Sequence, residues 1–114
     1  MNTQRLQLVT FLQAKRLKEL GYIWHAFAPS YWYDEDGALN AGNQHTLNYY
    51  TAPTVALALK WMRDEKNIKN AVYIGKYGWY MQIKNKERAQ GFMTYEAAES
   101  ELLDELLTIL EKEK

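Results

Sequence analysis

Cysteine is absent from this chain of 114 residues, and histidine and proline occur only twice each. Without cysteine, disulfides and thiolate metal sites are excluded. No apolar run approaches the roughly 20 residues that a membrane-spanning helix needs, and the N-terminus lacks the basic and then apolar pattern of a signal peptide. We therefore expect a cytoplasmic protein with no membrane partner.

The charges balance, with 14 basic and 14 acidic residues, but their distribution is uneven. Residues 60–88 hold eight Lys/Arg and three Asp/Glu, whereas 94–114 hold two Lys/Arg and seven Asp/Glu. This complementarity favours contact between the two segments, and the alternative is an acidic helix offered to a partner. The length predicts one domain, 1–114, with no repeat or linker.

The stretch from Thr51 to Ile74 has a helix pattern that runs directly into a strand pattern. Thr51 as N-cap and Pro53 in the first turn predict a helix that begins at about Ala52. Asn67 suits the left-handed residue that ends it. If Trp61 is buried against the sheet, Trp61→Ala should cost about 3–5 kcal/mol. The predicted buried face comprises Val55, Leu57, Ala58, Leu59, Trp61 and Met62.

Shorter signals place the other elements. Thr10 and Gln13 match a capping box, which predicts a helix over 11–20 with Gly21 as its left-handed end. A turn is indicated at Asp36-Gly37, and Thr94 is the expected N-cap of the final helix. Strands are predicted over 4–9, 22–28, 38–41, 45–50, 70–75 and 79–84, and a loop over 85–93, from which Phe92 packs onto the final helix.

Strands joined by short turns, with helices outside them, define the fold class. We predict an α+β fold: an antiparallel β-sheet of three to five strands with three α-helices packed on one face, in the order αβ(β)αββα. Alternation along 70–84 assigns the two faces of one hairpin. Its core face is predicted to hold Val72, Ile74, Trp79, Met81 and Ile83, and its other face Tyr73, Tyr80, Gln82 and Lys84.

Glu99 interrupts the apolar arc of the final helix. Three explanations are open: a cation from 60–88 pairs with it, the helix overhangs the sheet so that it meets water, or a second subunit completes its surroundings. Pairing is the favoured prediction because 60–88 is basic.

Four stretches together resemble a group of uncharacterised proteins associated with phages and mobile elements of gut bacteria. The order and spacing match over nearly the whole chain, and the third stretch is the distinctive one. The resemblance implies a small intracellular phage or prophage protein without known activity, so it assigns no functional residues. The stretches are T-x-x-x-A-K-x-L-K-E-x-G (10–21), YDEDG (33–37), Y-x-APT-x-ALA-x-KW-x-R-x-x-x-NI (50–68) and TYEAAESELL (94–103).

No arrangement of residues indicates catalysis, a cofactor or a metal ion. His25 falls in a predicted strand and His45 in a polar segment without ligands at helical spacing. The run from Asp34 to Gly37 resembles part of a calcium loop but lacks its closing glutamate, so a turn is the better interpretation. No glycine-rich phosphate loop or nucleophile elbow is present. We therefore predict a protein that is not an enzyme.

Aromatic residues are the main functional signal, with nine tyrosines and four tryptophans. A cluster of five either packs the core at one end of the sheet or exposes flat rings for binding. Binding to an unknown protein partner is the leading prediction, for a monomer or weak homodimer. The alternatives are a single-stranded nucleic-acid-binding module, disfavoured because 21–59 is net acidic, and a small hydrolase with a carboxylate/His site. The candidate binding residues are Tyr31, Trp32, Tyr33, Tyr49 and Tyr50.

Overall fold

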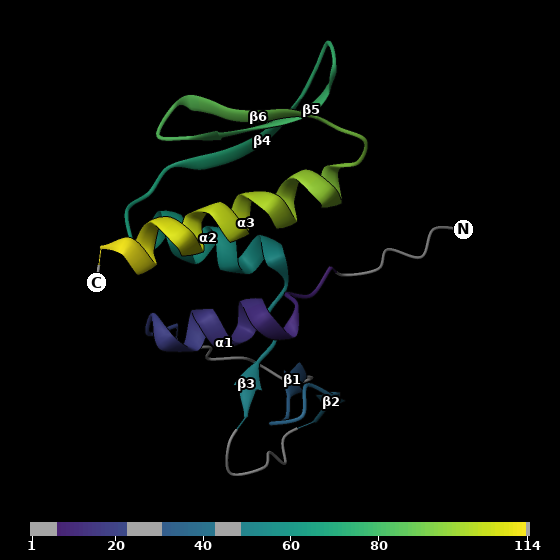
Figure 1. The fold of residues 1–114 in the computed structure, drawn as a ribbon, viewed down its shortest axis with the longest axis vertical. Coiled ribbons are helices and arrows are strands. Elements are labelled where there is room, and N and C mark those ends of the chain that lie inside the picture. The colour runs from purple at the N-terminus through teal and green to yellow at the C-terminus, as the bar shows by residue number, and fades with distance from the viewer. Residues whose placement is uncertain (1–6, 23–30, 43–48, 114) are drawn as a thin grey trace. The chain divides into compact units, whose positions relative to one another are not determined.

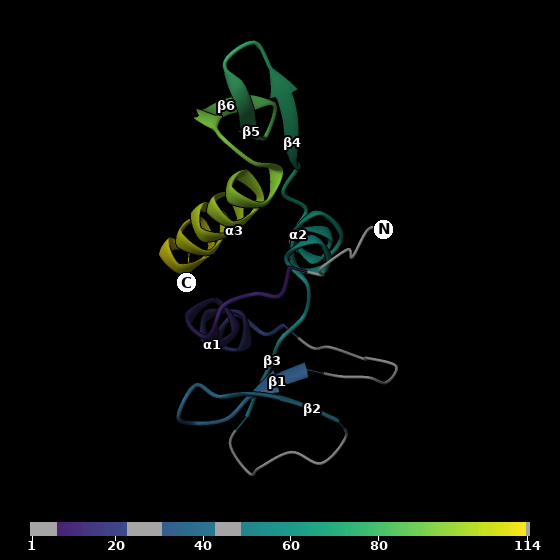
Figure 2. The same cartoon turned by 90° about the vertical axis from the view of Figure 1, so that its right-hand side faces the viewer.

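The computed structural model describes residues 7–22, 31–42 and 49–113. The chain divides into two compact units, Met1–Thr54 (unit 1) and Val55–Lys114 (unit 2), whose elements are shown in Figure 1 and Figure 2. The described elements follow the order helix, three strands, helix, three strands, helix. The predicted α+β class, antiparallel pairing and approximate order are confirmed, but the strands lie in two three-stranded sheets and not in one. One domain over 1–114 stays a prediction.

Unit 1 begins with the predicted capping-box helix. In α1, Phe11–Glu19, the Thr10 side chain accepts a hydrogen bond from the Gln13 backbone at 3.1 Å. The Gln13 side chain accepts one from the Thr10 backbone at 2.9 Å. This exchange satisfies the amide oxygen of Gln13, which explains why a polar residue here can be buried. Gly21 follows the helix with φ 93°, as predicted.

The small sheet of unit 1 has the order β2-β1-β3, with β1 at Tyr31–Tyr33, β2 at Leu39–Ala41 and β3 at Tyr50–Thr51. The β1–β2 turn is the predicted one, with Gly37 at φ 88°. Leu8 forms an isolated antiparallel bridge with Thr54. Most of the predicted strands 4–9, 22–28 and 45–50 lies outside the described residues.

The central helix α2, Val55–Asp64, begins later than the predicted start near Ala52. Thr51 pairs with Trp32 as the last residue of β3, so the prediction that it caps the helix is wrong. A residue before proline is disfavoured in a helix, and Ala52 and Pro53 both lie outside the helix. The Pro53 carbonyl accepts a hydrogen bond from Val9 at 2.9 Å. Strand pairing therefore replaces the cap.

The buried face of α2 is narrower than predicted. Val55, Ala58, Leu59 and Met62 are buried, but Leu57 is exposed and Trp61 only half-buried. The ammonium of Lys66 lies 5.1 Å from the centre of the Trp61 ring. The cost predicted for Trp61→Ala assumed full burial and is therefore too large. Asn67 ends the helix with φ 57°, as predicted.

The sheet of unit 2 has the order β4-β5-β6, with β4 at Asn70–Gly75, β5 at Gly78–Ile83 and β6 at Lys86–Phe92. The first two strands were predicted, but the prediction of a loop over 85–93 is wrong. Lys84 and Asn85 both adopt positive φ, 54° and 68°, and form a two-residue hairpin turn between β5 and β6. The polar sequence of β6 suits an edge strand that is exposed along most of its length.

Both helices of unit 2 pack on one face of this sheet, as Figure 1 shows. The final helix α3, Tyr95–Lys112, begins at the predicted N-cap Thr94, whose hydroxyl accepts from Ala97 at 3.0 Å. No helix in the described part of the chain is long and apolar enough to cross a bilayer. The buried residues of α3 are Ala98, Glu99, Leu102, Leu103, Leu106, Leu107 and Leu110.

Candidate binding surfaces

The aromatic residues proposed from the sequence lie together in unit 1 but are mostly engaged with one another. Trp32 is 5 % exposed, and its ring centre lies 6.1 Å from that of Tyr49 in an edge-to-face arrangement. The rings of Tyr33 and Tyr50 both make edge-to-face contacts with Phe11 of α1. Their ring centres lie 5.6 and 5.7 Å from that of Phe11. These rings hold the small sheet against α1.

Polar contacts restrain the same group. The Tyr33 hydroxyl donates to the Val9 carbonyl at 2.6 Å. The Lys18 ammonium donates to the Tyr49 carbonyl at 2.9 Å and lies 4.9 Å from the centre of the Tyr50 ring. Tyr31, at 37 % exposed, is the most open of the five. This favours the packing interpretation, and binding by these residues stays a prediction.

The polar candidates from the sequence do not form a site in the described residues. His25 and His45 lie outside them. Asp34 serves the turn, because its Oδ1 accepts from the backbone of Asp36 and Ala38 at 2.9 and 3.0 Å. These bonds, that to Ala38 foremost, lower the pKa of the Asp34 carboxyl. In the part of the chain that the structure describes, no group of three His, Cys, Asp or Glu is placed to hold a metal ion.

Large apolar side chains gather at the end of the unit 2 sheet where β4 turns into β5. Ile74 pairs with Trp79, and Trp79 with Phe92, so these three point to the face that the helices cover. Ile74 is nevertheless 63 % exposed. Met93 is 92 % exposed. The ring centre of Tyr95 lies 5.3 Å from that of Trp79. We call these five residues the apolar end.

Sequence reasoning assigned Ile74 and Trp79 to the core and did not find the apolar end. The alternation of side chains correctly gives the face, since Met81 and Ile83 further along the same strand are buried. It does not give the length of sheet that the helices cover. The pair Phe92-Met93, just before the cap at Thr94, is the one signal in the sequence.

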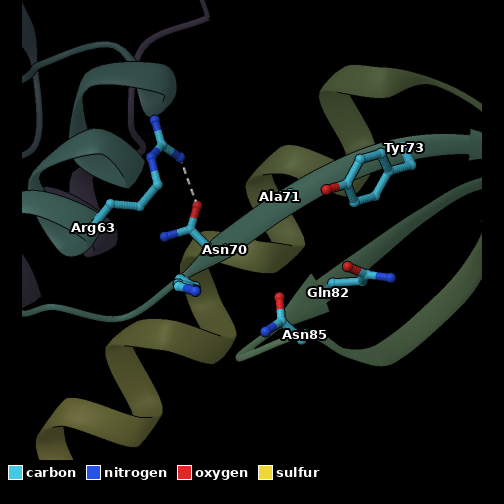
Figure 3. A pocket seen from close by; sticks show the side chains of 7 residues that line it. Arg63, Asn70, Ala71, Tyr73, Gln82 and Asn85 are labelled. Atoms are coloured by element: carbon cyan, nitrogen blue, oxygen red, sulfur yellow. Dashed lines mark hydrogen bonds between the residues drawn. The ribbon is translucent and has the colours of Figure 1, made fainter.

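The opposite face of this sheet carries a pair of tyrosines and a polar pocket. Tyr73 and Tyr80 are cross-strand neighbours whose ring centres lie 5.5 Å apart at an angle of 31°. Beside Tyr73 is a pocket of about 220 Å³ (Figure 3). We call the outward side of β4 and β5 with this pocket the tyrosine face. The pocket is lined by Arg63, Lys69, Asn70, Ala71, Tyr73, Gln82 and Asn85.

Asn70 fixes one wall of the pocket. Its Oδ1 accepts from the Arg63 guanidinium at 2.8 Å, and Figure 3 shows this bond between α2 and β4. Its Nδ2 donates to the carbonyls of Ile68 and Leu59 at 3.1 and 3.3 Å. Asn70 is buried, so these bonds satisfy its amide and hold Arg63 at the edge of the sheet.

Glu99 lies on the helix side of the sheet, in a smaller pocket of about 100 Å³ that Arg63, Asn70 and Tyr95 also line. It is 5 % exposed, so the overhang explanation is wrong. Its nearest described partner is the Tyr95 hydroxyl, which donates to Glu99 Oε2 at 2.8 Å. Burial raises the pKa of Glu99, whereas this bond and the charge of Arg63 lower it. Burial has the larger effect, so the pKa is raised overall. Burial, the bond to Glu99 and the carboxylates of Glu99 and Glu96 raise the pKa of Tyr95 to about 12, although the charge of Arg63 acts in the opposite direction.

The prediction that a cation from 60–88 keeps Glu99 ionised is therefore corrected: the net effect of its surroundings favours the neutral carboxyl. Arg63 of the basic segment does favour the ionised form, but loss of water outweighs it. Because the pKa is raised in the folded state, the contribution of Glu99 to stability is present at acid pH and is lost as the pH rises through the folded pKa.

We accordingly expect Glu99→Gln to unfold with a higher free energy than the parent at pH 7, by on the order of 1 kcal/mol, the usual net size of one buried polar interaction. Glutamine stays neutral and still accepts from Tyr95. The gain should shrink as the pH is lowered and the parent carboxyl takes up a proton. Urea unfolding at pH 7 and pH 4 measures it, with exposed Glu65→Gln as the control. A parent more stable than Glu99→Gln at pH 7 would mean that a cation fully compensates the carboxylate.

No family model, no curated protein and no solved structure matches this chain. The resemblance to phage-associated proteins stays a prediction. We therefore infer function from the surfaces of the chain itself.

Proposed function

We propose that this protein acts by binding another protein, without catalysis, and that the apolar end of unit 2 is the contact surface. The observation that carries the proposal is the exposure of Ile74 and Met93 beside Trp79, Phe92 and Tyr95. A single exposed apolar residue is ordinary, but a group of them marks a surface that a partner covers.

The composition of the apolar end supports the same conclusion. Tryptophan, tyrosine, phenylalanine and methionine are enriched in protein interfaces, and tryptophan and tyrosine dominate their binding energy. Trp79 is backed by its neighbours in the sheet and by the Tyr95 ring, so it loses little conformational freedom on binding.

The partner that fits is a short apolar segment of another protein. Five side chains cover less than the roughly 800 Å² per partner of a standard interface, which points to a transient contact. The charged residues nearest in sequence, Lys76 and Glu96, are of opposite sign. The partner segment therefore needs large aliphatic or aromatic anchors and no strong net charge.

We propose that this protein is a phage or prophage accessory protein and that it acts in the cytoplasm. Only the sequence resemblance supports this setting. The hydrolase alternative has no support in the described residues, since both histidines lie outside them.

The test is affinity capture from a gut bacterial lysate, with and without phage infection, using the parent and matched serine variants. Ile74→Ser and Met93→Ser alter exposed positions of the apolar end. Leu39→Ser and Leu12→Ser remove other exposed apolar side chains, from unit 1, and serve as controls. We expect a protein that the parent and both controls retain and that both apolar-end variants lose.

A further arm, Tyr31→Ser, separates this surface from the aromatic cluster in unit 1. The captured protein is then purified and its affinity for each variant measured by calorimetry. Loss with Tyr31→Ser and retention with Ile74→Ser and Met93→Ser would move the site to the cluster. Equal binding by every variant would contradict both surfaces.

A further inference from the structure

The tyrosine face, on the opposite side of the same sheet from the apolar end, has features that protein binding does not explain. Tyr73 is 45 % exposed, and its ring lies tilted against that of Tyr80. The Tyr80 ring in turn lies over Gly75, where a side-chain carbon would come within 3.0 Å of it. Glycine therefore leaves room for the Tyr80 ring beside the strand, and we call the tilted pair of rings the platform.

Hydrogen-bonding groups stand next to the platform. Gln82 and Asn85 point to the pocket beside Tyr73, as Figure 3 shows. No hydrogen bond joins either side-chain amide to another described residue. An amide offers a donor and an acceptor in one plane, which matches the edge of a nucleobase.

Basic residues also lie at this pocket. Arg63 and Lys69 line it. The Lys84 backbone donates to the Lys69 carbonyl at 2.9 Å, which brings the exposed Lys84 beside this group. Residues 60–88, which form α2 and the sheet in large part, carry eight basic and three acidic residues. Phosphate groups would complement this charge.

We propose that the tyrosine face binds single-stranded nucleic acid. One base stacks on the open ring of Tyr73, Gln82 and Asn85 contact its edge, and Arg63, Lys69 and Lys84 neutralise the adjoining phosphates. The strand is single because bases in a duplex are already stacked and cannot lie on a flat protein ring. An acidic peptide would use the cations but not the rings and amides, so nucleic acid accounts for more of the surface.

The binding test uses fluorescein-labelled dT12 and rU12 with the whole protein, followed by anisotropy at low salt. A hairpin duplex of matched length, free thymidine monophosphate and polyglutamate are the comparison ligands. We expect both strands to bind more tightly than the duplex, and affinity to fall as salt rises because counterions are released on binding. Monophosphate should compete only at much higher concentration, since it offers one base and one phosphate.

The variant test places binding on the platform. Tyr73→Ala should weaken binding to dT12 by about tenfold, within the usual range for loss of one stacked base, while Tyr73→Phe should retain it. Tyr77→Ala is the matched control, because Tyr77 is a 70 % exposed tyrosine at the tip of the same hairpin and does not line the pocket. The double variant Lys69→Gln, Lys84→Gln should weaken binding and reduce its salt dependence. Lys112→Gln in α3 is the control for charge.

Several results would overturn the proposal: no binding of either strand by the parent, equal binding of the duplex, or equal effects of Tyr73→Ala and Tyr77→Ala. Competition by polyglutamate as strong as that by dT12 would assign the face to acidic proteins instead. Ile74→Ser and Met93→Ser should bind dT12 like the parent. Failure of nucleic-acid binding would therefore leave the proposal of protein binding at the apolar end unaffected. Failure of protein binding would likewise leave the nucleic-acid proposal unaffected.

Discussion

Gly78→Ala is expected to lower the free energy of unfolding by about 3–5 kcal/mol, the largest effect that we predict for a single added methyl group. Two costs combine at this position. Gly78 has φ 113°, which side-chain-bearing residues rarely adopt. A Cβ there would also lie 2.8 Å from the Phe92 carbonyl oxygen, a backbone atom of the neighbouring strand that cannot move without disturbing the sheet.

Gly91→Ala separates these two costs within the same sheet. Gly91 also has positive φ, 87°, but the nearest atom to its added Cβ is 3.9 Å away, an ordinary contact. Its loss should be limited to backbone strain, about 1–2 kcal/mol. Urea unfolding followed by circular dichroism measures both variants. Equal losses at the two glycines would show that the close approach of β6 to Gly78 is absent in solution.

Met81→Ala is expected to cost about 3 kcal/mol, within the range for truncation of a large buried side chain. Met81 is fully buried on the central strand β5, paired with Val72 on one side and Ala89 on the other. Neighbours on both sides hold the backbone in place, so the space left by the side chain cannot easily close. The protein loses both the burial and the packing contacts.

The neighbouring residue provides the control for Met81. Gln82 points to the opposite, outward face, so Gln82→Ala should change the free energy of unfolding by less than about 0.5 kcal/mol. The same urea titration compares the two variants. If Gln82→Ala costs as much as Met81→Ala, the assignment of the strand's two faces is incorrect.

Local patterns were most informative where neighbouring residues complete a structure. The capping box at Thr10, the N-cap at Thr94 and the left-handed Asn67 depend on residues within one helical turn, and all three are as predicted. Errors arose where a distant strand intervenes. Thr51 has the chemistry of a cap, yet pairing with Trp32 draws it into β3. Strand β6 was missed because its turn uses Lys84 and Asn85 and contains no glycine.

The candidate surfaces show the same division. Alternation in β4 and β5 placed Tyr73, Tyr80 and Gln82 on the outward face, as the pairing register bears out. It could not show that Arg63 and Lys69 lie beside them, because α2 and β4 meet there only in the folded chain. The exposed Ile74 was likewise missed, since the extent of the helix cover depends on how the elements pack.

The sequence by itself determined the α+β class, the antiparallel hairpin of β4 and β5, the ends of α1 and the start of α3. These features follow from side-chain periodicity and from hydrogen bonds between near neighbours, which a sequence displays directly. Only the tertiary structure decided that the strands form two sheets, that the unit 1 aromatics are largely packed together, and that burial dominates around Glu99. Each of these depends on which distant residues meet, and exposure and desolvation are properties of that packing.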